Sequence, residues 1–381
     1  MPSPSAPAVI APADGATEVG APIAPADGAT EVGAPEVVAL GEVMLRLDPG
    51  ADRIRTARAF CVHEGGGEYN VARALRTAFG LRSAVVTALV DDEVGRLVED
   101  LVLASGVDPR WIRWVPAGGP VPARNGINFT ERGHGVRGAV GVSDRAGTAA
   151  SRLAPDDVPW GDVLAGARWF HTGGVFAGLS PSTTATALRA VREARALGVP
   201  VSFDTNFRPS LWRARGGREQ ACAAARALAA GCDVLIGSAW DLFPDVDDPP
   251  AADPRAAREA FERGVARILD VAPGVRVVAS TCRAVHSASR NSWGALVWSR
   301  TEGVHEAPGY GDLQILDRVG GGDGFAAGLV AGLLRGAALP EALGLAVASG
   351  ALAMTTPGDA SRGRSADVRA TAAGRPPAIA W

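Results

Sequence analysis

Short apolar segments alternate with amphipathic or alanine-rich segments along the chain from Val37 onward. Buried strands are short apolar runs, whereas helices repeat apolar residues every three or four positions, so the pattern predicts both kinds of element in alternation. The predicted strands are 37–45, 84–89, 169–172, 199–204, 233–236 and 275–280, and the predicted helices include 68–79, 93–105, 182–197 and 254–269. This alternation favours an α/β fold with a mostly parallel central sheet and helices on both faces.

The pattern changes between about residues 110 and 150. Segments 112–115, 127–131 and 136–142 are short, β-like and punctuated by glycine, with no helical segment between them. We therefore expect an antiparallel insert over about 110–150 that covers a site. Farther along, residues 323–354 read as two helices that are interrupted at Gly336 and Pro340.

The first 36 residues form a segment of a different kind. The string APADGATEVGAP occurs at 11–22 and again at 24–35, and the segment has few large apolar side chains. We expect a disordered tail, with a docking segment as the weaker alternative, followed by one folded domain over 37–381. Because the first basic residue is Arg46, the start does not resemble a secretory signal, and no apolar run reaches membrane-spanning length. We expect a cytoplasmic protein.

Composition narrows the chemistry, because all 38 basic residues are arginine and the chain has no lysine. A P-loop, a protein-kinase lysine and a Schiff-base lysine are therefore excluded. A formal net charge of -3 argues against nucleic-acid or membrane partners. The four cysteines lie singly and the five histidines show no paired spacing, so neither disulfides nor a zinc site is expected.

Three segments carry candidate chemistry. In the first, Asp317 to Gly328, three glycines precede Asp323 at the start of a predicted helix, where unpaired backbone N–H groups form an anion hole. A plain loop with a capping aspartate remains the alternative. The loose dinucleotide pattern in this segment is discounted, because no strand follows to bear a ribose-binding acid.

The second segment, Gly65 to Ala72, is a glycine turn that opens a helix, with Asn70 one turn inside it. It is either a surface for a polyhydroxylated ligand or a capped loop. The third, Asp204 to Trp212, follows a buried strand at the sheet edge where α/β proteins bind ligands, although a structural salt bridge is also consistent with it.

Together these segments resemble the ribokinase-like (PfkB) carbohydrate kinases. GGGDGFAAGL at 320–329 is similar to the family's C-terminal signature and GGGEYNVARAL at 65–75 to its N-terminal motif, and the resemblance covers about residues 37–360. GEVMLRLDP at 41–49 and DTNFRPSLW at 204–212 look most like 2-keto-3-deoxygluconate kinases. The resemblance implies a ribokinase-like three-layer fold in which the 110–150 insert forms a small β-sheet lid.

The resemblance further implies transfer of a phosphoryl group from ATP to a sugar hydroxyl, with Mg²⁺ bridging the phosphates. Asp323 is expected to be the general base, and Gly320, Gly321 and Gly322 the anion hole. The implied substrate-binding residues are Gly65, Gly66, Asn70, Arg46, Asn128, Arg145 and Arg208. The implied nucleotide-binding residues are Asn206, Ser238, Asp241, Thr281, Arg283, Gly322 and Gly358, with Asp241 also a candidate to reach Mg²⁺ through water.

Several positions depart from the family pattern. Arg46 stands where many relatives have aspartate, and it is either a partner for a substrate carboxylate or an exposed strand-end residue. Ser238 and Asp241 stand where the family has asparagine and glutamate. The expected substrate is 2-keto-3-deoxygluconate; the alternatives are a neutral sugar such as fructose, or a catalytically weak sugar-binding relative. Pairing of two copies through the strand edge of the lid gives a homodimer as one further arrangement.

Overall fold

The computed structural model describes residues 33–119, 121–247 and 254–375. The expected disordered tail lies almost wholly outside these residues. Its last residue, Glu36, is ordered against the domain: its backbone N–H donates to the Arg82 carbonyl at 2.8 Å and its carboxylate lies 3.0 Å from Arg168. The folded domain therefore begins slightly before Val37.

The central sheet confirms the expected mostly parallel arrangement. Its strand order is β13-β12-β11-β10-β9-β8-β1-β4-β5, with β14 paired to β12, and every pairing from β11 across to β5 is parallel. Strands β12, β13 and β14 are antiparallel. The strands are β1 Val37–Leu40, β4 Ser83–Asp91, β5 Asp108–Pro116, β8 Trp169–Gly173, β9 Val201–Asp204, β10 Val234–Ile236, β11 Val277–Ser287, β12 Arg290–Ser299, β13 Gly303–Glu306 and β14 Tyr310–Gln314.

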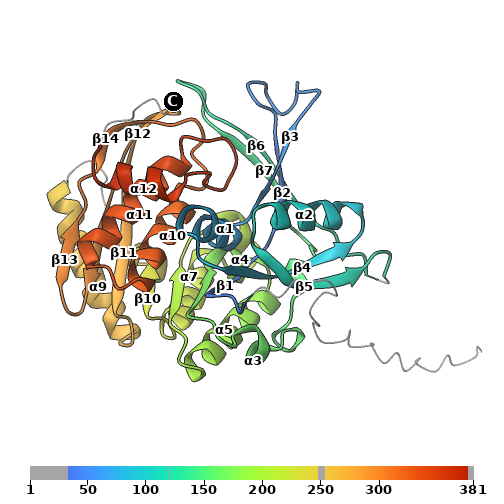
Figure 1. Ribbon diagram of the computed structural model, residues 1–381, viewed down its shortest axis with the longest axis horizontal. Helices are drawn as coiled ribbons and strands as arrows, with labels where there is room; N and C mark the ends of the chain where they lie inside the picture. The colour runs from blue at the N-terminus through green and yellow to red at the C-terminus, as the bar shows by residue number, and fades with distance from the viewer. Residues whose placement is uncertain (1–32, 120, 248–253, 376–381) are drawn as a thin grey trace, which may run out of the picture.

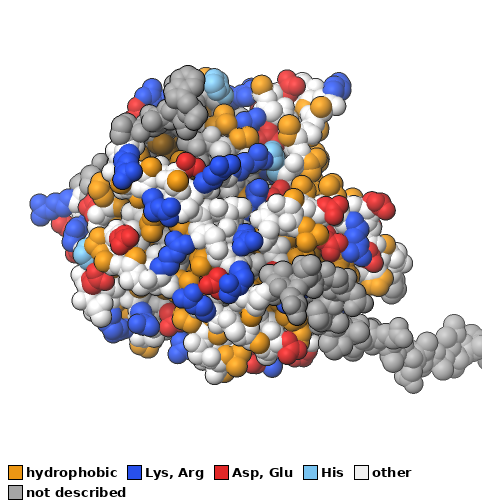
Figure 2. All heavy atoms as spheres, viewed as in Figure 1, with side chains coloured by type: hydrophobic (Ala, Val, Ile, Leu, Met, Phe, Trp, Pro, Cys, Tyr) orange, Lys and Arg blue, Asp and Glu red, His pale blue; other side chains and the backbone are white. Residues whose placement is uncertain are grey.

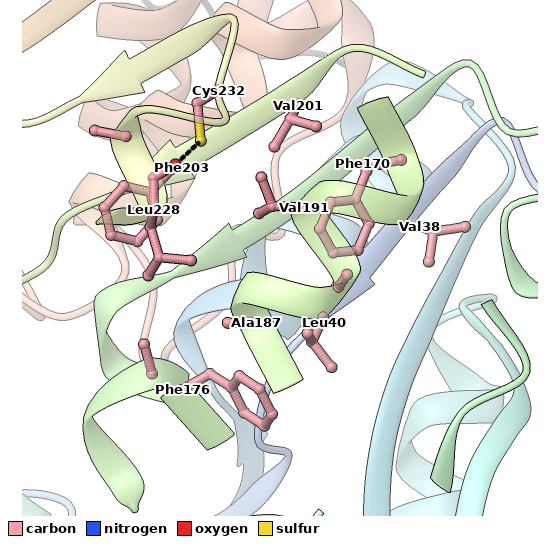
Figure 3. Packing of buried hydrophobic residues seen from close by; sticks show 14 of the residues in the cluster. Val38, Leu40, Phe170, Phe176, Ala187, Val191, Val201, Phe203, Leu228 and Cys232 are labelled. Atoms are coloured by element: carbon pink, nitrogen blue, oxygen red, sulfur yellow. Dashed lines mark hydrogen bonds between the residues drawn. The ribbon is translucent and has the colours of Figure 1, made fainter. Parts of the chain in front are cut away.

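Helices cover both faces of this sheet. Because successive side chains of a strand point to opposite faces, neighbouring residues of β1 lie in two different hydrophobic clusters. Val38 lies in a cluster with Phe170, Phe176 and Leu228 (Figure 3), whereas Val37 lies in the cluster that contains Phe325. The helices are α1 Gly67–Phe79, α2 Glu93–Ala104, α3 Trp160–Val163, α4 Gly174–Leu179, α5 Pro181–Ala196, α6 Pro209–Trp212, α7 Gly217–Ala229, α8 Ala239–Leu242, α9 Pro254–Val271, α10 Gly321–Leu334, α11 Leu339–Ala353 and α12 Ser365–Ala372, with short 3₁₀ turns at Ala150–Arg152 and Pro155–Asp157.

A smaller sheet of order β3-β2-β6-β7 rises from the body of the molecule (Figure 1). Its strands are β2 Met44–Asp48, β3 Cys61–Gly65, β6 Gly126–Glu131 and β7 Val140–Asp144. The expected 110–150 insert supplies only β6 and β7, because the segment at 112–115 belongs to β5 of the central sheet. The predicted single strand 37–45 is instead divided at Gly41–Val43, where the chain leaves the central sheet for the smaller one.

Helix α10 is buried at almost every position and packs closely on α11. A Cβ added at Gly328 would lie 2.6 Å from Cα of Ala346, and one at Gly324 would lie 2.9 Å from the Ser349 carbonyl oxygen. Glycines four residues apart therefore let the two helices approach until their backbones touch. This packing fixes the N-terminus of α10, and with it Asp323, at the edge of the central sheet.

Charge is mixed on the visible surface. Figure 2 shows arginine side chains spread over this face with acidic side chains among them. Within the three described ranges, no helix is both long enough and apolar enough to cross a membrane.

Candidate active site

A cavity of about 1610 Å³ lies between the smaller sheet and the carboxyl ends of β9 and β10. The smaller sheet and the loop after it contribute Thr130, Arg132 and Arg145 to its wall, and the loop after β9 contributes Asp204 and Asn206. The start of α10 and the antiparallel strands β11 and β12 complete the wall. This position agrees with the rule that ligands of open α/β sheets bind beyond the carboxyl ends of the strands.

The GGGD segment forms the turn into α10. Gly320 has φ 82°, and a Cβ there would lie 1.8 Å from the carbonyl oxygen of Asp359, so only glycine fits. Gly320, Gly322 and Asp323 line the cavity, whereas Gly321 faces Met354. The first-turn N–H groups of a helix have no partner within the helix, and this end carries the positive end of the helix dipole. The turn is therefore suited to hold an anion.

Asp323 is only 8% exposed and accepts a hydrogen bond from Nδ2 of Asn70 at 2.7 Å. Burial raises the pKa of Asp323 to about 7, although the Asn70 hydrogen bond and the charge of Arg208 oppose the rise. A carboxyl with a pKa near neutrality is suited to take a proton from a hydroxyl, because the strongest base that is still ionised at the working pH serves best.

Two further carboxyls beside Asp323 also bind protons readily. Burial, together with repulsion from Asp323, raises the pKa of Glu68 to about 7 and that of Asp204 to about 8. One oxygen of Glu68 accepts the backbone N–H of Phe176 at 3.0 Å. Near neutral pH Asp204 is largely protonated and Glu68 is protonated in about half of the molecules, so this part of the site is less negative than its composition implies and tolerates an anionic ligand.

The turn after β9 is strained at Asn206. Its φ of 31° makes it the sole non-glycine residue with positive φ in the described chain, a conformation that asparagine tolerates better than most residues. Its backbone N–H donates to Oδ1 of Asp204 at 3.1 Å, which stabilises the turn. Asn206 and Arg208 thereby reach the cavity wall.

Three arginines line the cavity without a carboxylate partner. Arg208, Arg283 and Arg318 make no side-chain hydrogen bond or ion pair with the described residues, and all three are exposed toward the cavity. Partial burial and the charges of Arg318 and Arg208 lower the pKa of Arg283. Unpaired positive charges that repel one another are stabilised by a bound anion. Sequence reasoning missed Arg318, although its place two residues before Gly320 in a lysine-free chain was a usable signal.

The structure brings most of the expected site residues together. Arg145 lines the cavity while its Nε lies 3.3 Å from the buried carboxylate of Glu42, and Asn70 reaches the site through its bond to Asp323. The remaining expected residues in the cavity wall are Asn206, Arg208, Ser238, Asp241, Thr281, Arg283, Gly320, Gly322 and Asp323.

The expected role of Arg46 in binding a substrate carboxylate does not fit the structure. Its side chain is 0% exposed and lies among the carboxylates of Asp48, Asp317 and Asp359. The alternative of an exposed strand-end residue does not fit either. The guanidinium already has carboxylate partners, so it has no reason to exchange them for those of a ligand.

Besides Arg46, Asn70 and Gly321, four other expected contacts lie outside the cavity wall. Both amide atoms of Asn128 are hydrogen-bonded within the smaller sheet. Its Nδ2 donates to Oγ1 of Thr130 at 2.9 Å, and its Oδ1 accepts from Oγ of Ser143 at 3.0 Å. Gly358 is buried, lies against the ring of His63 and is not part of the cavity wall. Gly65 faces Asp359, and Gly66 lies where a Cβ would be 1.9 Å from the Glu42 carbonyl oxygen; the two glycines shape the start of α1.

Asp241 is committed to local structure. Its Oδ2 accepts from the backbone N–H of Ser238 at 2.9 Å and from Oγ1 of Thr205 at 2.8 Å, which caps α8. Across residues 33–119, 121–247 and 254–375, no group of three or more acidic, histidine or cysteine side chains is arranged to hold a metal ion. A single carboxylate such as that of Asp241 fits Mg²⁺ that arrives with nucleotide phosphates, because Mg²⁺ keeps several of its waters and takes only one or two protein carboxylates.

Comparison with known proteins agrees with this geometry. The model of the pfkB family carbohydrate kinases matches residues 34–242 and 288–365. The chain is 30% identical to the 2-dehydro-3-deoxygalactonokinase of Haloferax volcanii, over 85% of this chain and 92% of that one. It is 31% identical to the 2-dehydro-3-deoxygluconokinase of Thermoproteus tenax, over 85% and 89%. Plant fructokinases such as that of Solanum tuberosum match only 46% of this chain.

Solved structures share the whole architecture. The 2-dehydro-3-deoxygluconokinase of Thermotoga maritima superposes with a TM-score of 0.80 at 31% identity, covering 89% of this chain and 99% of that one. A ribokinase II from E. coli in complex with ATP and Mg²⁺ shares the fold at 20% identity, with a TM-score of 0.71 over 90% of this chain and 100% of that one.

Proposed function

Because this chain belongs to the pfkB family of carbohydrate kinases and is thus a sugar phosphotransferase, we propose that its substrate is an acid sugar, 2-keto-3-deoxygluconate or its galacto counterpart. The observation that carries the substrate class is Arg208, an arginine without a carboxylate partner in the same cavity as Asp323. A guanidinium binds a carboxylate through two parallel hydrogen bonds, which recognises an acid sugar and gives nothing comparable to a neutral one.

In the proposed reaction, the 6-hydroxyl of the sugar attacks the γ-phosphorus of ATP. The new bond joins the sugar oxygen to phosphorus, the bond from phosphorus to the β,γ-bridging oxygen breaks, and ADP leaves. The hydroxyl proton passes to Asp323, and the sugar 6-phosphate is released. Asp323 serves as general base because it is ionised in a useful fraction of molecules at neutral pH.

Negative charge on the transferred phosphoryl group is held by the backbone N–H groups of Gly320 to Asp323, in the manner of an oxyanion hole. Arg283 and Arg318 supply the positive charge that lysine provides in other phosphotransferases. Bound Mg²⁺ supplies charge neutralisation between the phosphates. The smaller sheet acts as the lid that excludes water from the reacting groups.

The nucleotide is proposed to lie along the wall formed by Asn206, Ser238, Asp241, Thr281 and Arg283, and the sugar near Asn70, Arg145 and Arg208. Asp241 would hold Mg²⁺ through water, since its Oδ2 already accepts the hydrogen bond that caps α8.

An ADP-release assay on a panel of sugars tests the proposal. We expect 2-keto-3-deoxygluconate and 2-keto-3-deoxygalactonate to be turned over with kcat/KM values far above those for fructose and ribose. Above the pH at which Asp323 is ionised, Arg208→Ala should raise KM for the acid sugars by at least ten-fold and leave KM for the neutral sugars unaffected. Equal losses on acid and neutral sugars would favour a neutral-sugar kinase, and a thermal shift with sugar but without any turnover would favour a sugar-binding relative.

We also propose that two copies pair through the smaller sheet in the cytoplasm. Its outer strands β3 and β7 expose Val62, Val140 and Val142, each more than 40% accessible. Exposed strand edges with apolar side chains are natural pairing surfaces. Sedimentation of the wild type against Val142→Lys tests this arrangement, which predicts a dimer that the charged variant disrupts.

A further inference from the structure

Arg46 occupies the centre of a buried ion network that joins three separate parts of the chain. From β2 its Nη1 donates to Oδ1 of Asp359 at 2.6 Å, and its Nη2 donates to Oδ2 of Asp48 at 3.0 Å and to Oδ2 of Asp317. The side chains of all four residues are between 0% and 4% exposed. Water therefore contributes little to this network, and the three carboxylates depend on the guanidinium.

Two of these aspartates lie against the turn into α10, Asp317 through its carboxylate and Asp359 through its backbone. Asp317 accepts the backbone N–H of Val319 at 3.1 Å through Oδ1 and that of Gly358 at 3.3 Å through Oδ2. The carbonyl of Asp359 lies directly against Gly320. The turn at 317–320 is thus hydrogen-bonded by the Asp317 carboxylate and packed against the backbone of Asp359, and the carboxylates of both residues bind the same guanidinium.

The third carboxylate connects the network to the smaller sheet. Asp48 belongs to β2, and its Oδ2 also lies 3.2 Å from Nε of Arg132, which follows β6 and lines the cavity. Movement of the smaller sheet over the cavity therefore acts on the same guanidinium that orients the turn into α10.

We propose that Arg46 is a positioning residue that holds the anion-hole loop in its active geometry and couples it to the lid. Without Arg46, Asp317 and Asp359 repel each other and the turn at Gly320 loses its two supports. A displacement of about 1 Å in groups that position a reacting centre costs on the order of 100-fold in rate. This inference rests on the proposed role of Gly320 to Asp323 in holding the transferred phosphate.

Steady-state kinetics of Arg46→Ala, with and without added guanidinium chloride, test the proposal. We expect kcat to fall by about 100-fold while KM for the sugar changes by less than about three-fold, and millimolar guanidinium to restore at least ten-fold of the loss. Sodium chloride and urea at equal concentration should restore nothing. A sugar KM that rises in step with the fall in kcat, or a kcat that guanidinium leaves unchanged, would overturn the proposal.

Arg113→Ala is the matched control. Arg113 forms a partly buried ion pair with Asp157 at 2.9 Å, and neither residue belongs to the cavity wall. We expect it to lower thermal stability without lowering kcat and without any response to guanidinium. If Arg46→Ala fails to fold, Asp359→Asn replaces it, because this variant keeps the guanidinium paired with two carboxylates. The proposal requires Asp359→Asn to lower kcat at an assay temperature well below its melting temperature, where the variant is folded. A kcat equal to that of wild type would contradict the proposal.

Hydrogen exchange separates this proposal from the proposed function. In Arg46→Ala, or in Asp359→Asn, the amides of 317–322 and 358–361 should exchange at least ten-fold faster than in wild type, while those of α5 stay unchanged. This readout needs no catalytic activity. A wild type that phosphorylates no sugar would defeat the proposed function alone, whereas unchanged exchange in both segments would defeat the positioning role alone.

Discussion

Nδ2 of Asn70 lies 2.7 Å from Oδ2 of Asp323, although 253 positions separate the two residues in the chain. The contact joins the first turn of α1 to the first turn of α10, and so places two helix N-termini at one point of the cavity. The other amide atom, Oδ1 of Asn70, is buried and has no hydrogen-bond partner among the described residues. A buried acceptor without a partner is costly, so this oxygen is suited to receive a hydroxyl of the bound sugar.

Replacement of Asp323 by Asn should abolish most of the turnover. The amide keeps the shape of the side chain but cannot accept the hydroxyl proton, so kcat should fall by about 100-fold to 10,000-fold. Binding of ATP, measured by calorimetry, should change by less than about three-fold. Asp91→Asn removes an exposed carboxylate at the last residue of β4, outside the cavity wall, and should behave as wild type. A kcat for Asp323→Asn within ten-fold of wild type would mean that another group takes the proton.

The acid limb of the pH profile should report Asp323. Burial raises its pKa to about 7 and Arg208 opposes the rise, so kcat/KM should increase as pH rises through about 7 and the carboxylate forms. Arg208→Ala removes a cation that favours the carboxylate, and the midpoint should move to higher pH. Arg213→Ala, in the same short connection but outside the cavity wall, should leave the midpoint in place. A midpoint that moves downward in Arg208→Ala would contradict the electrostatic link.

Arg318 should matter for the nucleotide more than for the sugar. Arg318→Ala is expected to raise KM for ATP by about 10-fold to 100-fold, since a charge-assisted contact contributes on the order of 1.5–3 kcal/mol. Because Arg283 and Arg318 act on the same anion, the double variant should lose less than the sum of the two single losses. Arg96→Ala, an exposed arginine on α2, is the control. An unchanged KM for ATP in both single variants would remove these arginines from the phosphate site.

Sequence periodicity was sufficient for the buried parallel strands from β1 to β11 other than β5, because buried parallel strands and amphipathic helices each have a local signature; the edge strands β5, β12, β13 and β14 were not assigned to the central sheet. Helix 68–79 and strand 169–172 lie within one residue of the observed α1 and β8. The smaller sheet was not predictable in the same way. Its four strands come from two separate stretches, and the break at Gly41–Val43 coincides with Gly41 and Glu42, which interrupt the apolar run within the predicted single strand 37–45.

The candidate site also has parts that the sequence predicts and parts that it does not. Motifs that act through backbone shape, such as Gly320 to Asp323, are recognisable in the sequence because few residue types permit that geometry. A charged side chain is different, since its partners are set by tertiary structure. Arg46 and Arg208 are both candidate carboxylate ligands in the sequence, with Arg208 the better one, yet the sequence does not show that Arg46 is surrounded by three aspartates and Arg208 by none.

The stability of the fold should depend on pH through Asp204. Burial and the nearby charges of Asp323, Asp241 and Glu68 raise its pKa from an ordinary value of 3.8 to about 8. Between these two values the folded chain holds a proton that the unfolded chain releases. The contribution of Asp204 to the free energy of unfolding is therefore greatest below about pH 4. This contribution decreases as pH rises toward 8, by at most about 1.4 kcal/mol per pH unit.

Asp204→Asn removes this proton without changing the size of the side chain. The variant should melt at a higher temperature than wild type at pH 8, and the difference should shrink as pH falls toward 5, where Asp204 in wild type is protonated as well. Thermal denaturation of the ligand-free proteins in buffers of equal ionic strength measures this. Asp270→Asn, at an exposed position of α9, is the control and should show no such dependence. A variant that is less stable than wild type at pH 8 would show that the Asp204 carboxylate is stabilised by its surroundings, contrary to the repulsion derived from its neighbours.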